Sequence, residues 1–289
     1  MIKHNFVGAF ICFLIFVGCF FWGESGTVVF YLNIVSLLVV VSGTLGAVFL
    51  SHPFNRLSSA FKVAKNVYTK DVISNSDEVV NLLLDMAVRS KYDGILSLER
   101  YEKQLTVSFL RDALAMVVDG YSEEEIKDIL GTEMHFFRLR RQQSERVFRT
   151  MAAVAPPFGV AGSIIGLIGM LVGMGDTGII LKTIPLALTS TLYSIIISYF
   201  ILIPIAEGIY SKTQRELYLQ SIISEGVVEI AREKNVYKLE RKLSTFLTPS
   251  QREGAGQGIR QIQKRYADMK KGKGAPREQR AADSAAKAK

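Results

Sequence analysis

The sequence predicts an all-α integral membrane protein with four transmembrane helices in two pairs and a helical cytoplasmic domain between the second and third helices. Four stretches of the 289-residue chain carry no charged side chain, and they are Phe6 to Trp22, Val28 to Leu50, Met151 to Met174, and Ile184 to Ala206. Each approaches the roughly 20 apolar residues that an α-helix needs to cross a hydrocarbon core about 30 Å thick. The two pairs are separated by the charge-rich residues 51–150.

This pattern divides the chain into five expected segments. They are transmembrane helices 1 and 2 (1–50), a cytoplasmic helical domain (51–150), transmembrane helices 3 and 4 (151–206), a cytoplasmic C-terminal helix (207–247) and a basic, disordered tail (248–289). The long loop has 15 Lys or Arg and 15 Asp or Glu, whereas the chain after Ala206 has 18 and 10 and carries the whole net charge of +8. The positive-inside rule therefore places the loop and both termini in the cytoplasm.

The soluble segments show helical periodicity and helix-capping signals. Apolar residues recur at steps of three and four from Asn55 to Tyr68, which predicts an amphipathic helix. Ser76 begins a second expected helix, and the stretch from Ile95 to Val118 forms a third. Ser122 and Glu125 have the spacing of a capping box, so we expect a long helix to begin there and continue into the third span.

The sequence contains no pattern that indicates catalysis. It has no phosphate-binding glycine loop, and its three histidines, His4, His52 and His135, lie far apart. Cys12 and Cys19 are two helical turns apart in the first apolar stretch, which favours packing over metal or redox chemistry. We therefore predict no enzyme activity, no catalytic residue and no metal site. The first stretch is not followed by the small residues of a signal-peptide cleavage site, so we expect it to remain as a membrane anchor.

The four spans also lack the ionisable residues that usually mark an ion carrier in a membrane. They contain small and hydroxyl-bearing residues instead. In the third span the glycines form one ridge at steps of three and four, at Gly159, Gly162, Gly166, Gly169 and Gly173. Such a ridge packs helices backbone to backbone, either within the chain or against a partner. Ser163 lies beside the ridge, and the fourth span has Thr189, Ser190, Thr191 and Ser194 at comparable depth, where neutral hydroxyls could line an ion path.

Prolines interrupt both of these spans. Pro156 and Pro157 stand at the cytoplasmic start of the third span, and Pro185 stands at the outer start of the fourth. These prolines are also compatible with simple helix initiation. Pro204 lies deeper, and because it removes a main-chain hydrogen bond it predicts a distortion near Phe200.

Several motifs occur in a specific order between residues 28 and 210. They are Ser42-Gly43-Thr44-Leu45-Gly46-Ala47 with His52-Pro53, Gly94-Ile95-Leu96-Ser97-Leu98-Glu99 with Asp119-Gly120, the proline-glycine run at 156–171, and Thr191-Leu192-Tyr193 with Pro204-Ile205-Ala206. Together they resemble the MotA/PomA subunits of the bacterial flagellar stator, within the MotA/TolQ/ExbB proton channel superfamily. The related TolQ/ExbB proteins usually have one span before the large loop, whereas two are expected here.

The resemblance implies a subunit of an ion-driven rotary motor in the bacterial inner membrane. Five such subunits would surround two copies of a single-span MotB/PomB-type partner that supplies a membrane aspartate, and no cofactor or nucleic acid is involved. The transported ion would be H+ or Na+, and the energy of its flow would become torque on the rotor protein FliG. The alternatives are a TolQ/ExbB-like or non-flagellar energising subunit and a passive membrane scaffold.

The resemblance also implies roles for individual residues. Together with the hydroxyl pattern, it places five residues along the ion path, and these are Pro156, Ser163, Ser190, Thr191 and Pro204. Lys91 and Glu99 match the charged residues that meet FliG, with lysine where arginine is usual, so a planar bidentate contact is lost. Ser194 replaces an expected glycine, and Ser198-Tyr199 replaces a frequent Ala-Asn pair. The hydroxyls at Ser163, Ser190 and Thr191 lean toward sodium.

Overall fold

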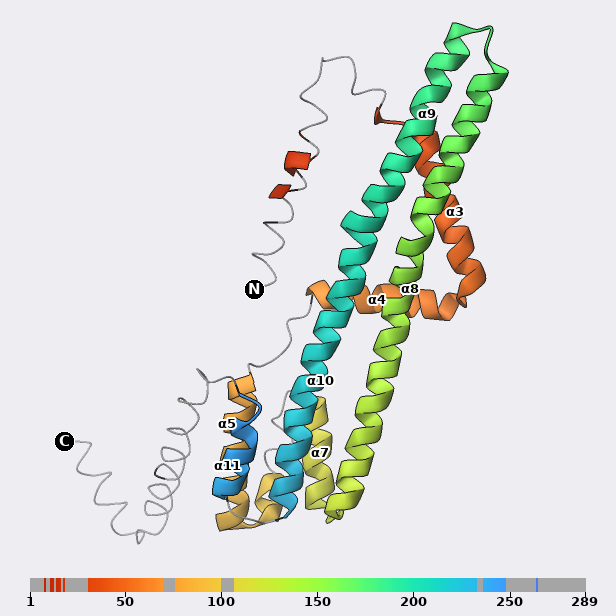
Figure 1. The fold of residues 1–289 in the computed structure, drawn as a ribbon. Coiled ribbons are helices and arrows are strands. Elements are labelled where there is room, and N and C mark those ends of the chain that lie inside the picture. The colour runs from red at the N-terminus through yellow and green to blue at the C-terminus, as the bar shows by residue number, and fades with distance from the viewer. Residues whose placement is uncertain are drawn as a thin grey trace, which may run out of the picture. The chain divides into compact units, whose positions relative to one another are not determined.

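The computed structural model describes residues 31–69, 76–99, 107–232 and 236–247, together with residues 8, 11, 12, 14–16, 18 and 264. Within these residues it contains helices and turns but no strand. The elements are α3 (Ile34–Ser51), α4 (Phe54–Thr69), α5 (Ser76–Asp93), the 3₁₀-helix η1 (Ile95–Leu98), α7 (Ser108–Val118), α8 (Glu123–Val172), α9 (Thr177–Ile196), the π-helix η2 (Ile197–Leu202), α10 (Ile203–Ala231) and α11 (Val236–Ser244) (Figure 1).

The chain divides into two compact units. Unit 1 comprises Met1–Asp71 and Leu139–Thr213, and unit 2 comprises Val72–Arg138 and Gln214–Lys289. Unit 1 contains α3, α4, α9 and η2, and unit 2 contains α5, η1, α7 and α11. The boundaries between the units fall within α8 and α10, so each unit includes part of both helices.

Three described helices are long and apolar enough to cross a membrane. They are α3, α8 and the continuous helix Thr177–Ala231 that α9, η2 and α10 form together. Only 22% of the residues of α3 are buried within the chain, and 33% of the residues in the apolar 18-residue stretch of each of the other two helices. Most of this apolar surface therefore requires lipid or protein neighbours. The first predicted span, Phe6 to Trp22, lies largely outside the described residues, as does the predicted disordered tail.

In unit 1, the apolar part of α8 runs alongside α9, and α3 lies against α9 (Figure 1). The amphipathic helix α4 crosses the base of this group, where Phe61 packs edge-on against Phe148 of α8 at a centroid distance of 5.4 Å. The stripe predicted along α4 is largely confirmed, because Leu57, Ala60, Ala64 and Val67 are buried. Phe61 is an exception, since 51% of its surface is exposed.

Unit 2 has its own apolar core. Large buried side chains come from α5, α7, the first part of α8, the last part of α10 and α11, and they include Leu83, Leu110, Ile126, Ile222 and Leu243. Segments from the loop and from the C-terminal part of the chain therefore share one core. Burial of these side chains is the main force that orders unit 2.

The predicted capping box at the start of α8 is confirmed. The Ser122 main-chain N–H donates to the Glu125 carboxylate at 2.9 Å, and the Glu125 N–H donates to the Ser122 hydroxyl at 3.4 Å. These bonds satisfy donors that the first helical turn leaves open. Hydrogen bonds from the Ser122 side chain and main chain also lower the pKa of Glu125. The predicted long helix is confirmed as well, since α8 continues for 50 residues.

The alternative interpretation of Pro156 and Pro185 as helix starts was wrong. Pro156 lies well inside α8, as the predicted long helix requires, and Pro185 lies inside α9. The predicted spans leave residues 175–183 as the turn between them, but the turn is shorter because Asp176 caps α9, its carboxylate accepting the Gly178 N–H at 2.7 Å. The stretch expected as one helix from Ile95 to Val118 contains the short η1 and then α7, with residues 100–106 outside the described residues.

Candidate ion path between the third and fourth spans

The glycine ridge of α8 faces α9 of the same chain. A Cβ atom placed on Gly159 would lie 2.5 Å from Cβ of Ser194, and one on Gly162 would lie 2.8 Å from Cβ of Ser190. At Gly166 the contact is with the backbone itself, because a Cβ there would lie 2.7 Å from the Ala187 main-chain nitrogen. The ridge therefore forms the seam between α8 and α9, which confirms packing within the chain.

Ser163 and Thr191 meet across this seam. The Ser163 hydroxyl lies 2.5 Å from the Thr191 hydroxyl, 2.5 Å from the carbonyl oxygen of Ala187 and 3.1 Å from that of Gly159. The Thr191 hydroxyl lies 3.4 Å from the Gly159 carbonyl oxygen. Both side chains are half-buried, so this group of four oxygen atoms, which we call the hydroxyl cluster, reaches the surface of the seam.

The chemistry of the hydroxyl cluster suits a cation that passes without being held. Two hydroxyl protons face two carbonyl oxygens, so the cluster is satisfied when no ion is present. If the hydroxyls rotate, their lone pairs and the two carbonyls present only neutral oxygen atoms. Such oxygens can replace part of the hydration shell of an ion without supplying a countercharge.

The other hydroxyls of the fourth span make different contacts. Ser190 is fully buried, faces Gly162 and donates to the Leu186 carbonyl of its own helix at 2.8 Å. Thr189 instead faces α3, where its hydroxyl lies 2.7 Å from that of Ser36. The structure thus brings Ser163 and Thr191 together, and Ser190, the neighbour of Thr191 in the same turn of α9, faces Gly162 instead.

The α3–α9 contact was not found by sequence reasoning. Besides the Ser36–Thr189 pair, the Tyr193 hydroxyl accepts the N–H of Asn33 at 3.0 Å and donates to the carbonyl oxygen of Tyr31. Asn33 in turn caps α3, since its side chain accepts from Val35 and Ser36. The cap of α3 was predictable, because Asn33 directly precedes an apolar run and is a favoured N-cap residue.

The two prolines assigned to the ion path flank the hydroxyl cluster along the chain. Pro156 is half-buried in α8, seven residues before Ser163. Pro204 is exposed at the start of α10 and follows the π-helix η2, which includes Phe200. The predicted distortion near Phe200 is therefore present, and it takes the form of a widened helical turn.

Lys91 and Glu99 lie on either side of a tight corner in unit 2. Lys91 is in the last turn of α5, Glu99 directly follows η1, and both side chains are exposed. Gly94 makes the corner with a φ of 84°, a conformation that other residues rarely adopt. Leu98 is fully buried and anchors the corner to the core of unit 2, and this contact positions the backbone that carries Lys91 and Glu99.

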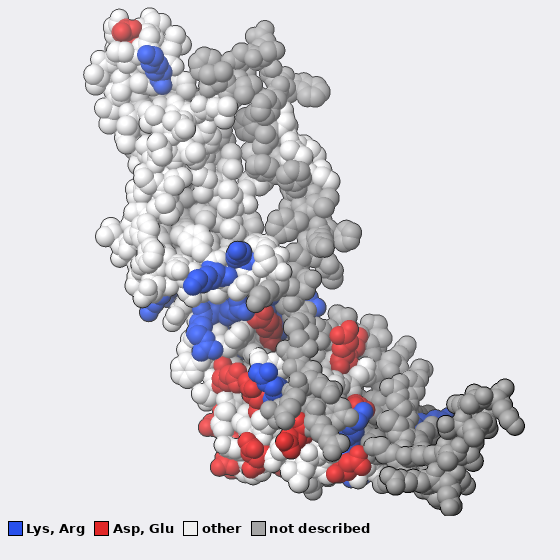
Figure 2. Space-filling view, turned by 180° about the vertical axis from the view of Figure 1, so that it is seen from behind, with Lys and Arg blue, Asp and Glu red and all other residues white. Residues whose placement is uncertain are grey.

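Basic residues border the charge-free surface of unit 1 (Figure 2). They lie on α4, on the 139–150 part of α8 and on α10, and they are Arg56, Lys62, Lys65, Arg140, Arg141, Arg146, Arg149 and Lys212. Arg149 forms ion pairs with Glu145 at 2.6 Å and Glu207 at 2.8 Å, and these hydrogen bonds raise the pKa of Arg149. The pair with Glu207 connects α8 and α10 at the end of the predicted spans, whereas the pair with Glu145 lies within α8.

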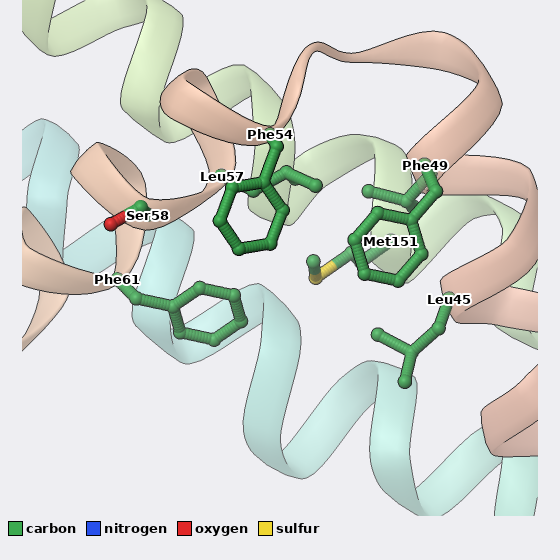
Figure 3. A pocket seen from close by; sticks show the side chains of 8 residues that line it. Leu45, Phe49, Phe54, Leu57, Ser58, Phe61 and Met151 are labelled. Atoms are coloured by element: carbon green, nitrogen blue, oxygen red, sulfur yellow. The ribbon is translucent and has the colours of Figure 1, made fainter.

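A cavity of about 230 Å³ lies where α3, α4 and α8 meet. Figure 3 shows the side chains of Leu45, Phe49, Phe54, Phe61 and Met151 around it, with Ser58 as a polar neighbour. The lining contains no ionisable group and none of the predicted site residues. This cavity therefore suits apolar contact rather than ion transport. Among the described residues, no group of three or more His, Cys, Asp or Glu could hold a metal ion.

A charge-free helical seam with a cluster of neutral oxygens is the construction expected of a subunit of a membrane ion channel. The sequence model of the MotA/TolQ/ExbB proton channel family matches residues 101–221. Motility protein A of Borreliella burgdorferi is 30% identical over 174 residues, which is 60% of this chain and 67% of that protein. The chain belongs to the MotA/TolQ/ExbB proton channel family.

Longer matches place it among the MotA/PomA members of that family. Motility protein A of Treponema phagedenis is 29% identical over 85% of this chain and 93% of its own length. The structure of the flagellar MotAB stator complex from Bacillus subtilis contains a similar chain, with a TM-score of 0.77 and 26% identity over 87% of this chain and 97% of that one. The family is one of channels rather than of enzymes, and its apolar helices make this chain a multi-pass membrane protein.

Proposed function

We propose that this chain is the A subunit of a flagellar stator, which forms a cation channel with a MotB/PomB-type partner and converts ion flow into torque. The transported ion, H+ or Na+, is the substrate of this process, and the proposal includes no cofactor. The main support is the hydroxyl cluster, because it places neutral oxygen atoms along a seam between two spans, 151–174 and 184–206, that contain no acid. The named relatives are motility proteins, which favours this role over a TolQ/ExbB-like energiser.

The proposed arrangement assigns four spans to the chain in the inner membrane, with the large loop and both termini in the cytoplasm. Five copies surround two copies of the partner, whose aspartate carries the ion past Ser163 and Thr191. Loading or release of the ion changes the charge of that aspartate and alters its contacts with the α8–α9 seam. Pro156 and Pro204 provide the places where the two helices can bend in response.

The ion path is tested by removing one hydroxyl at a time. In the assembled complex, Ser163→Ala and Thr191→Val should each raise the ion concentration for half-maximal rotation about fivefold, because loss of one neutral polar contact is worth ~1 kcal/mol. The measurement is rotation speed of tethered cells while external sodium is varied at fixed pH and pH is varied at fixed sodium. The series that changes the speed also identifies the ion.

Thr183→Val is the matched control for this experiment. Thr183 lies in the same helix, and its hydroxyl bonds only the carbonyls of Ile179 and Ile180 in α9 itself. It should leave the half-maximal ion concentration unchanged. Equal effects of Thr183→Val and Thr191→Val would contradict an ion path at the hydroxyl cluster.

The rotor contact is tested by reversing charge at the α5–η1 corner. Glu99→Lys should lower torque, because the exposed carboxylate would no longer attract a cationic group of FliG, while Glu78→Lys on the exposed first turn of α5 serves as a control. Exposed ion pairs contribute roughly 0–1 kcal/mol and weaken with salt, which suits contacts that form and break rapidly. The measurement is torque at several ionic strengths. Unchanged torque at every ionic strength would exclude Glu99 from the contact.

A further inference from the structure

One buried hydrogen bond joins the two proline-containing spans of unit 1. The Ser198 hydroxyl, in the fourth span, donates to the main-chain carbonyl of Ala152, in the third, at 2.7 Å. Only 1% of Ser198 and 6% of Ala152 is exposed. Neither residue is in the hydroxyl cluster, and the contact lies outside the α8–α9 glycine ridge.

The Ala152 carbonyl has lost its usual partner because of the prolines that follow it. In an α-helix the carbonyl of residue 152 accepts the N–H of residue 156, and in a widened turn it would accept that of residue 157. Both positions are proline, so neither N–H exists. A buried carbonyl without a donor is unfavourable in a membrane, and the Ser198 hydroxyl supplies the donor from another helix.

Ser198 itself lies at the irregular point of the fourth span. It is the second residue of η2, and its own carbonyl accepts the N–H of Ile203, five residues on, which is the bond of a π-turn. Pro204 follows at once and also lacks an N–H. The main-chain hydrogen bonds of both spans are therefore weakened at the level where Ser198 joins them.

We propose that Ser198 is a positioning residue for torque generation, whose hydroxyl couples the turn of the third span that precedes Pro156 to the π-turn of the fourth. This role rests on the proposed stator function. With the bond formed, the two weak points move together when the ion-carrying partner pushes on the seam. Without it, each span bends independently and part of the ion-driven movement does not reach the cytoplasmic unit. A neutral hydrogen bond shifts an equilibrium only about two- to tenfold, so it can open and close in each step.

The proposal predicts a change in coupling without a change in ion affinity. In cells that carry the complete A–B complex, Ser198→Ala should lower maximal rotation speed about two- to tenfold at saturating ion, while the half-maximal ion concentration stays at the wild-type value. Ser198→Thr retains the hydroxyl and should recover most of the speed. A residue that only packed the two helices would be rescued by size rather than by the hydroxyl, so recovery by Ser198→Cys and not by Ser198→Thr would overturn the role.

Thr213→Val is the matched control. Thr213 carries a buried hydroxyl farther along the same continuous helix, and this hydroxyl bonds the Ile209 carbonyl of that helix. It should keep a normal maximal speed. Normal speed in Ser198→Ala, or an equal loss in Thr213→Val, would show that the interhelical bond has no part in coupling.

The bond itself is tested independently of rotation by a double-mutant cycle on the purified A–B complex. Pro156→Ala restores an N–H that can reach the Ala152 carbonyl, so Ser198→Ala should lower the melting temperature with proline at 156 and have little further effect with alanine there. Additive shifts would refute the shared carbonyl. If the cycle shows coupling but the wild-type complex drives no ion-dependent rotation, the stator function fails while the bond stands, and the positioning role fails with the function.

Discussion

The side chains of the hydroxyl cluster were predictable, but their main-chain partners were not. Ser163 and Thr191 stand out because hydroxyls are unusual beside a glycine ridge in a charge-free span. That Ser163 bonds the Ala187 carbonyl depends on the register between α8 and α9, which the sequence does not specify. The same applies to Ser198, since an unpaired carbonyl at Ala152 follows from Pro156 but the side chain that reaches it requires the packed structure.

The register of the seam depends on single glycines, and Gly166 is the most sensitive of them. Gly166→Ala should destabilise the assembled complex by about 1–3 kcal/mol, because the new methyl group would meet the backbone of Ala187 at 2.7–2.8 Å. Backbone atoms cannot turn away as a flexible side chain can, so the helices must separate. The measurement is the melting temperature of the purified A–B complex.

Gly46→Ala is the control, because a Cβ atom at Gly46 in α3 would find nothing within 4 Å in the chain. It should be neutral or slightly stabilising, since alanine favours a helix more than glycine does. If Gly166→Ala melts at the wild-type temperature, the close approach of α8 and α9 at this level is wrong.

Among the elements, helices with strong periodicity and a cap were predicted well, and proline positions were not. The starts of α5 and α8 lie where Ser76 and Ser122 predicted them, and the hydrogen bonds between Ser122 and Glu125 cap α8. Pro185 suggested a helix start, but Asp176 caps α9 earlier and the helix continues through the proline. Local rules fail there because apolar spans form helices even where one main-chain bond is missing.

The composition of α4 predicts that this helix lies at the membrane boundary. Helix α4 contains three basic residues, Arg56, Lys62 and Lys65, and no acidic residue. The aromatic residues Phe54 and Phe61 have 71% and 51% of their surface exposed. Cationic amphipathic helices with exposed aromatics lie in the headgroup region. Phe54→Trp, in a Trp22→Phe background, should therefore show blue-shifted fluorescence that brominated lipids quench in reconstituted membranes.

Tyr92→Trp provides the control in the same background, because Tyr92 is 50% exposed at the end of α5 in the loop expected in the cytoplasm. Its emission should be that of a water-exposed indole and should not respond to brominated lipids. Equal quenching at both positions, or none at position 54, would remove α4 from the membrane surface.

At the scale of the whole molecule, the sequence predicted which parts are apolar better than which parts pack together. The charge-free stretches anticipate three described membrane-length helices, because composition alone decides solubility in lipid. The common core of unit 2 was not anticipated, since it joins residues 72–138 to residues after 214 through contacts between distant segments. Periodicity identifies a buried face but not the partner that covers it.

The composition of the four charge-free stretches predicts that this chain conducts ions only together with a second protein. Because these four stretches contain no Asp, Glu, Lys, Arg or His, the A subunit alone should give liposomes no cation permeability above the lipid background. Addition of a MotB/PomB-type partner should produce flux, and replacing the membrane aspartate of that partner by asparagine should abolish it. The measurement is the decay of an imposed sodium or pH gradient. Flux through the A subunit alone, or undiminished flux with the asparagine partner, would mean that the titrating group lies on this chain.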